Sequence, residues 1–178
     1  ILKQMEKAVL LYEGSKDMKR AWPEAERSFP YRRQYGAGIY SGWLSMLLTY
    51  RGDYDAADSM ARAGGPPWWL PYMRMRINAK KGHFMTAEAF GDSSSGHGGL
   101  TATTFINYLM ATAQMENGRF EPAIRTLNQL RNSLTNGFNQ RPLYYAKSHY
   151  LEGLIREKKG ERNLAIDAFE KFLVLWKD

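Results

Sequence analysis

A glycine recurs four times in this chain in nearly the same sequence context, and this repetition constrains the fold more than any other feature. The four contexts are "YRGDYDAA", "KKGHFMTA", "ENGRFEPA" and "KKGERNLA", and their glycines are Gly52, Gly82, Gly118 and Gly160. An alanine follows each of these glycines after five residues, at Ala57, Ala87, Ala123 and Ala165. Self-similarity at intervals of about 20–50 residues indicates a stacked repeat architecture, in which each unit buries its hydrophobic face against its neighbours.

The sequence around these glycines predicts pairs of helices joined by short turns. Apolar residues recur every three to four positions, which is the period of an amphipathic helix. The expected helices cover residues 2–13, 16–28, 39–50, 54–63, 68–80, 84–90, 101–116, 121–134, 143–159 and 161–176. The segment "GDSSSGHGG" at 91–99 is expected to be the most flexible part of the chain, because glycine and serine dominate it. The fold class is therefore expected to be all-α.

The helix pairs are expected to belong to one domain. Residues 39–178 are expected to form about four hairpins of a single α-solenoid. Residues 1–38 are expected to supply N-terminal helices, as the end of a preceding repeat followed by a linker rich in proline and glycine. The chain begins at Ile1 and not at a methionine, which favours a fragment or a processed product.

The turns resemble those of the tetratricopeptide repeat family. The segments "RGDYDAA" at 51–57 and "GRFEPAI" at 118–124 are the best matches, and the resemblance covers about residues 39–176. It implies a right-handed superhelix of stacked hairpins, each made of two antiparallel helices, A and B. The ending "YLEGLIREKKGERNLAIDAFEKFLVLWKD" also resembles the last repeat of such regions in large bacterial regulatory proteins, which often carry a kinase, cyclase or DNA-binding domain.

The resemblance also assigns packing roles to small residues. In the family, a small residue seven positions before the turn glycine lets helices A and B approach closely, and the alanine after the turn packs against helix A. Here the small residues are Ser45, Ala111 and Gly153, whereas Met75 departs from the pattern. The intervals between successive turn glycines are 30, 36 and 42 residues, against about 34 in the family.

The position four residues before the turn glycine also departs from the family. It is usually apolar there, but three of the four repeats have a polar residue in this chain. Apolar residues stand one place earlier, at Ile77, Ala113 and Ile155. This shift predicts that the helix A faces are somewhat rotated, or that the turns are re-spaced.

Aromatic residues at helical spacing are the candidate binding residues. A tyrosine lies ten residues before three of the turn glycines, at Tyr72, Tyr108 and Tyr150, and an aromatic residue lies thirteen before two of them, at Trp69 and Phe105. The resemblance places these positions on the concave face, where tyrosines would offer rigid contact area at low entropic cost. The alternative is that they pack between neighbouring repeats, which is the commoner role of aromatic residues at helical spacing.

The charge balance is compatible with anionic partners. The chain carries a net charge of +7, and Arg76 and Lys80 are candidates to meet acidic groups beside these five aromatic residues, which we call the aromatic ladder. The neighbouring Arg74 and Lys81 fall on nearly the opposite side of the same helix, at about 100° per residue. Such dispersed charge is more typical of a solvated helix than of a nucleic-acid footprint.

Other features of the sequence favour no chemistry. The serines at 93–95 lie near His97, but a glycine-rich loop does not hold a catalytic base rigidly. The three histidines are dispersed and cysteine is absent, so we expect no metal or cofactor. No apolar stretch is long enough to span a bilayer and no signal segment opens the chain, which slightly favours the cytoplasm.

These observations predict a non-catalytic interaction or scaffold module. Its concave face would bind a segment of another protein or another domain of the parent chain. Two alternatives remain open: single-stranded nucleic acid bound by aromatic stacking and basic residues, and a structural spacer that oligomerises. An enzyme is the class least consistent with the sequence.

Overall fold

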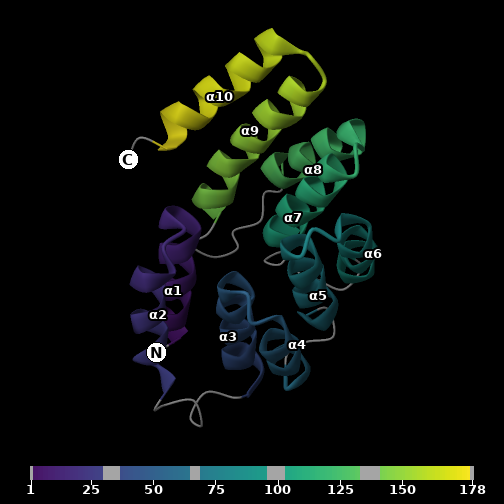
Figure 1. Ribbon diagram of the computed structural model, residues 1–178. Coiled ribbons are helices and arrows are strands. Elements are labelled where there is room, and N and C mark those ends of the chain that lie inside the picture. The colour runs from purple at the N-terminus through teal and green to yellow at the C-terminus, as the bar shows by residue number, and fades with distance from the viewer. Residues whose placement is uncertain (1, 30–36, 65–68, 96–102, 133–140, 177–178) are drawn as a thin grey trace. The chain divides into compact units, whose positions relative to one another are not determined.

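The computed structural model describes residues 2–29, 37–64, 69–95, 103–132 and 141–176. Within these ranges the chain is all-helical, as the sequence predicts, and strands are absent from them (Figure 1). The ten helices found there are α1 (Leu2–Ser15), α2 (Met18–Glu26), α3 (Ala37–Arg51), α4 (Tyr54–Arg62), α5 (Trp69–Lys80), α6 (Phe84–Ser95), α7 (Thr103–Glu116), α8 (Phe120–Asn132), α9 (Arg141–Lys158) and α10 (Arg162–Trp176).

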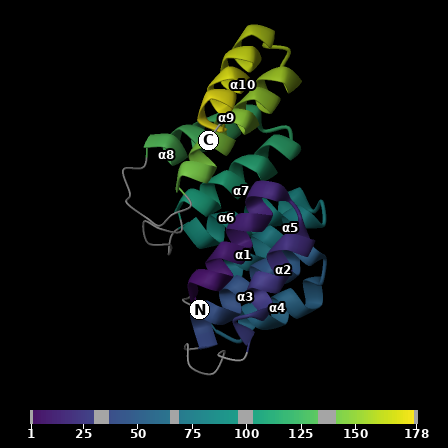
Figure 2. The ribbon, with the colours of Figure 1, turned by 90° about the vertical axis from the view of Figure 1, so that its left-hand side faces the viewer.

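Successive helices pack in adjacent pairs, which we call hairpins. The chain divides into two compact units, residues 1–97 and residues 98–178. The first unit holds the α1–α2, α3–α4 and α5–α6 hairpins, and the second holds α7–α8 and α9–α10 (Figures 1 and 2). Within each unit, the first helix of a hairpin also contacts both helices of the hairpin before it.

The four turn glycines share one hydrogen-bonded geometry. All four have a positive φ, between 73° and 89°, which side chains disfavour and glycine tolerates. At Gly52, the glycine N–H donates to the carbonyl of Thr49, and the Asp53 N–H donates to the carbonyl of Leu48. The same pair of bonds recurs at the other three turns. This is the Schellman arrangement, in which a left-handed residue satisfies the last carbonyls of a helix.

The α1–α2 hairpin also turns through a left-handed residue, but this residue is not a glycine and its backbone hydrogen bond is different. Lys16 has a φ of 56°, and its N–H donates to the carbonyl of Tyr12. Ala21, five residues after Lys16, is completely buried like Ala57, Ala87 and Ala123 after three of the other turns. The sequence suggested only the end of a preceding repeat here, because it offers no glycine at position 16. The structure pairs α1 with α2 as it pairs the later helices.

Small residues hold the helices of a hairpin close together. Ala57, Ala87 and Ala123 are completely buried. A Cβ built on Gly153 would overlap the ring of Phe169 in α10, so this approach of α9 to α10 requires glycine. At the equivalent place in α3, Ser45 lies against α4, and its hydroxyl donates to the carbonyl of Ala57 at 2.6 Å.

The residues five before the turn glycines form the buried side of the first helices. Leu47, Ile77, Ala113 and Ile155 are all buried. The polar residues that follow them are used differently: Gln114 Oε1 accepts a bond from Thr126 of α8 at 2.9 Å, and Arg156 pairs with Glu152 and Glu161. The polar groups at this position are therefore paired with polar or charged groups of the same hairpin.

One helix is longer than the sequence predicts. We expected it to end at residue 90 and a flexible segment to follow, but α6 continues to Ser95. Gly91 is buried at the place where Ala61 is buried in α4, nine residues after the turn glycine. Packing against α5 therefore stabilises a glycine inside a helix, despite its poor helix propensity.

Candidate functional site

The aromatic ladder of the first unit lies largely inside the unit. The ring of Tyr72 is 1% exposed and the side chain of Arg76 is 3% exposed. Trp69 packs on α3 so closely that a Cβ on Gly42 would overlap its indole. The sequence analysis leaves two roles open for Trp69 and Tyr72, contact with a ligand and packing between repeats. Their positions in the first unit fit packing, since these side chains hold α3 and α5 together.

A buried carboxylate explains how a guanidinium can lie there. Glu13, near the end of α1, is 6% exposed, and its Oε1 lies 3.1 Å from Nη2 of Arg76. The hydroxyl of Tyr50 donates to the same carboxylate oxygen, and Nη1 of Arg76 donates to the Tyr72 hydroxyl at 2.7 Å. A buried charge is tolerated only when paired and hydrogen-bonded, so this network ties α1 to α3 and α5.

Lys80 lies at the exposed margin of this network. Its Nζ is 5.6 Å from the centre of the Tyr50 ring. Partial burial lowers the pKa of the Lys80 ammonium, and the positive charges of Lys16 and Arg76 lower it further. Among the candidate residues on α5, Lys80 is exposed and Trp69 is half-buried, whereas Tyr72 and Arg76 are buried.

The ladder residues of the second unit are more accessible. Tyr108 is half-buried, and its ring centre lies 5.1 Å from that of Tyr144 in α9. Tyr150 is 42% exposed, and its ring packs against the rings of Phe169 and Phe172 in α10. The side chain of Phe105 lies outside the described residues.

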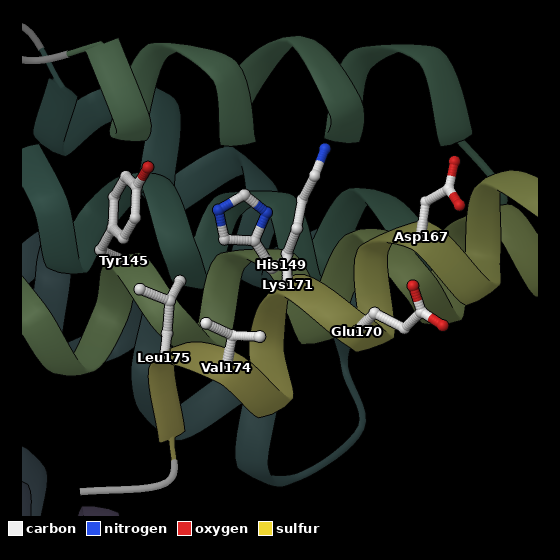
Figure 3. Close-up of a pocket in the computed structure, with 7 residues that line it drawn as sticks. All are labelled: Tyr145, His149, Asp167, Glu170, Lys171, Val174 and Leu175. Carbon is white, nitrogen blue, oxygen red and sulfur yellow. The ribbon is translucent and has the colours of Figure 1, made fainter.

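A groove beside α9 and α10 combines apolar and charged side chains (Figure 3). We call it the α9–α10 groove, and its lining residues are Tyr145, His149, Asp167, Glu170, Lys171, Val174 and Leu175. Figure 3 shows the Tyr145, His149 and Lys171 side chains pointing to the same side, with Leu175 next to Tyr145. Val174 is 73% exposed, so an apolar contact surface is open to solvent here.

The groove contains one titrating group near neutral pH. Burial lowers the pKa of His149 below its ordinary value of 6.5, and the charge of Arg131 in α8 lowers it further. The ring also packs edge-on against Tyr145, with 5.2 Å between ring centres. At neutral pH, the His149 imidazole is therefore mainly neutral in the folded protein.

A second, more polar hollow adjoins the groove and shares His149, Asp167 and Lys171 with it. Arg131 of α8 reaches Glu152 of α9 at 2.8 Å, and Arg156 reaches Glu152 at 3.3 Å. Arg156 also pairs with Glu161 at 2.6 Å. These ion pairs compensate one another, so the hollow presents paired charges rather than a field of one sign.

The sequence analysis missed the groove residues on α10. A signal was present in the run "FLVLW" at 172–176, where five consecutive apolar residues occur in one helix. At about 100° per residue, five successive side chains cover the whole circumference of a helix. Some of them must therefore be exposed, and an exposed apolar cluster indicates a contact surface.

Among the residues that the structure describes, no three His, Asp or Glu side chains are placed to hold a metal ion. The side chains of residues 93–95 and all of His97 fall outside the described residues. Among the helices that the structure describes, none is long and apolar enough to cross a membrane.

Comparisons with known proteins add no assignment. Neither a protein-family model, nor a curated protein, nor a solved structure matches this chain. The function is therefore argued from the side chains described above.

Proposed function

We propose that this chain is a non-catalytic helical-repeat module that binds a segment of another protein. Its hairpins would belong to a solenoid of the tetratricopeptide type, and the segment would lie in the α9–α10 groove. The observation that carries this proposal is the exposure of Val174, Leu175 and Tyr145 beside the charged Lys171 and Asp167. Apolar surface with a few polar groups around it is the usual make-up of a binding site.

Charge argues for a protein ligand over a nucleic acid. Asp167 and Glu170 line the groove together with Lys171, and the pKa of His149 is lowered, so the groove holds more acidic than basic groups at neutral pH. Acidic groups repel phosphates, and single-stranded nucleic acid requires a positively charged track. A peptide with apolar residues and a basic residue fits these side chains better.

Selection of peptides from a random displayed library tests the proposal. The immobilised chain should enrich apolar peptides with at least one basic residue. The double variant Val174→Asp/Leu175→Asp should bind the selected peptides at least about tenfold more weakly than the wild type. Leu173→Asp is the matched control, because this neighbour on α10 is exposed but does not line the groove.

Two outcomes would contradict the proposal. One is the absence of enrichment, or binding that the groove variant leaves unchanged. The other is tight binding of an oligothymidine that falls steeply with salt, which would favour the nucleic-acid alternative.

A further inference from the structure

A second apolar surface of the α9–α10 hairpin lies beside the groove. We call it the end face, and its residues are Tyr150, Ile166, Phe169, Leu173 and Trp176. Ile166 is 45% exposed and Leu173 is 56% exposed. On α10, Ile166, Phe169 and Leu173 follow one another at intervals of three and four, so they share one side of the helix. Exposed apolar residues in such a stripe require a reason.

The hairpin before it shows what such a face binds. In the α7–α8 hairpin, the corresponding side chains hold α9: Ile124 and Leu127 of α8 belong to the same core as Leu151 and Ile155 of α9. Ile124 lies six residues after its turn glycine, as Ile166 does, and Leu127 lies nine after it, as Phe169 does.

The first helices of the two hairpins correspond in the same way. Tyr108 of α7 packs on Tyr144 of α9, and Tyr150 occupies the same position in α9, ten residues before the turn glycine. The end face therefore repeats the surface on which α9 lies, and continues an interface that the structure already contains.

Two positions of the end face differ from that surface, and they define what would bind it. Thirteen residues after the turn glycine, α8 has Arg131, which pairs with Glu152 of α9 at 2.8 Å, whereas α10 has Leu173. Three residues before the turn glycine, α7 has the buried Met115, whereas α9 has the exposed Glu157. A carboxylate opposite Leu173 would be desolvated without a partner, and a basic residue near Glu157 would be favoured.

We infer that the end face binds an amphipathic helix of another protein, which lies on α9 and α10 as α9 lies on α7 and α8. The bound helix has an apolar stripe like that of Leu151 and Ile155, an apolar residue where α9 has Glu152, and a basic residue near Glu157. This surface is separate from the α9–α10 groove, so the inference goes beyond the proposed function and does not rest on it.

The test uses peptides of the sequence of residues 141–158, capped at both ends and labelled for fluorescence anisotropy. One peptide is unaltered and the other carries Glu152→Leu. The wild-type chain should bind the Glu152→Leu peptide about tenfold more tightly, because its leucine meets Leu173. In a Leu173→Arg chain the preference should reverse, since this change recreates the Arg131–Glu152 pair.

Two substitutions show where the peptide binds. A chain with Ile166→Asp should bind the Glu152→Leu peptide at least about tenfold more weakly than the wild-type chain. A chain with Val174→Asp, on the groove side of α10, should bind that peptide as tightly as the wild type does. Equal binding of both peptides by the wild type, or an unchanged preference in Leu173→Arg, would overturn the inference. A concentration-dependent dimer that Ile166→Asp dissociates, without peptide binding, would assign the end face to a second copy instead. Because Val174→Asp/Leu175→Asp affects only the groove, failure here and failure of the proposed function give different results.

Discussion

At the scale of single residues, backbone conformation at the turns decides where hairpins form. Four turns use glycine at a positive φ, and these are the turns that the sequence makes visible. The turn at Lys16 has the same handedness with a side chain present, at a cost of about 1 kcal/mol. A search of the sequence for turn glycines therefore does not find the first hairpin, although Ala21 follows Lys16 at the usual distance of five residues.

This cost predicts the effect of two substitutions at one site. Both Lys16→Gly and Lys16→Ala remove the ion pair with Glu13, which is 2.9 Å long and formed by a half-exposed lysine. Only glycine relieves the left-handed strain, so we expect the Gly variant to be more stable than the Ala variant by about 1 kcal/mol. Urea unfolding of both variants measures this difference, and equal stabilities would contradict it.

Gly153 is required for a different reason, which is the close approach of α9 to α10. Because a Cβ there would overlap the ring of Phe169, we expect Gly153→Ala to lower the free energy of unfolding by about 2 kcal/mol. Adding Phe169→Leu should recover part of the loss in a double-mutant cycle. Gly14→Ala is the matched control: a Cβ there meets nothing within 4 Å, so it should be neutral or slightly stabilising.

His149 predicts a pH dependence of stability. Its pKa in the folded protein is lowered from 6.5 by burial, and the nearby charges of Arg131, Glu152 and Lys171 add smaller effects of both signs. A lowered pKa means that folding favours the neutral ring. The stabilisation from His149 is therefore complete above about pH 6.5 and is lost as the pH falls through the lowered pKa.

Two measurements check this dependence. The free energy of unfolding should fall more steeply between pH 7 and pH 5 in the wild type than in His149→Gln. The His149 ring resonances should titrate with a midpoint below that of an unfolded peptide. A midpoint at or above 6.5 would contradict the burial argument.

At the scale of helices, the sequence predicts what local patterns control and misses what packing controls. The existence and pairing of α3 to α10 follow from repeated turns and the helical period. The end of α6 does not, because Gly91 is buried against a neighbouring helix that a composition argument ignores. The burial of Arg76 also escapes prediction, since its partner is Glu13 of α1, 63 residues earlier in the sequence.

The docking of α1 gives a prediction at this scale. Glu13→Ala leaves Arg76 buried without its carboxylate, so we expect the first unit to lose about 3 kcal/mol of stability. Replacing both residues, as Glu13→Leu/Arg76→Met, should recover most of the loss, because a buried ion pair contributes little over apolar packing.

An exposed ion pair of the same region serves as the control. Lys7→Ala removes the 3.2 Å contact between Lys7 and Glu24. Because the Lys7 side chain is more than half exposed, we expect the free energy of unfolding to change by less than about 0.5 kcal/mol. Equal losses in Glu13→Ala and Lys7→Ala would show that burial of the network does not matter.

At the scale of the whole molecule, the division into two compact units predicts fragments that fold. Residues 1–97 and residues 98–178 each contain their own packed hairpins. Each fragment made separately should give a helical circular dichroism spectrum and a cooperative thermal transition. In repeat proteins stability grows with the number of stacked units, so the three-hairpin fragment should melt at the higher temperature. A fragment that is unfolded at room temperature would show that its unit depends on the other.

The Glu13–Arg76 pair also determines which hairpins open together. Tandem hairpins that touch only their immediate neighbours behave as a one-dimensional chain, and such a chain frays from its ends one hairpin at a time. The pair joins α1 to α5 and so links the first hairpin directly to the third. Opening of the first hairpin alone would leave Arg76 of the third without its carboxylate, which makes separate fraying costly. Amide hydrogens of α1, α3 and α5 should accordingly exchange together, as a single cooperative block.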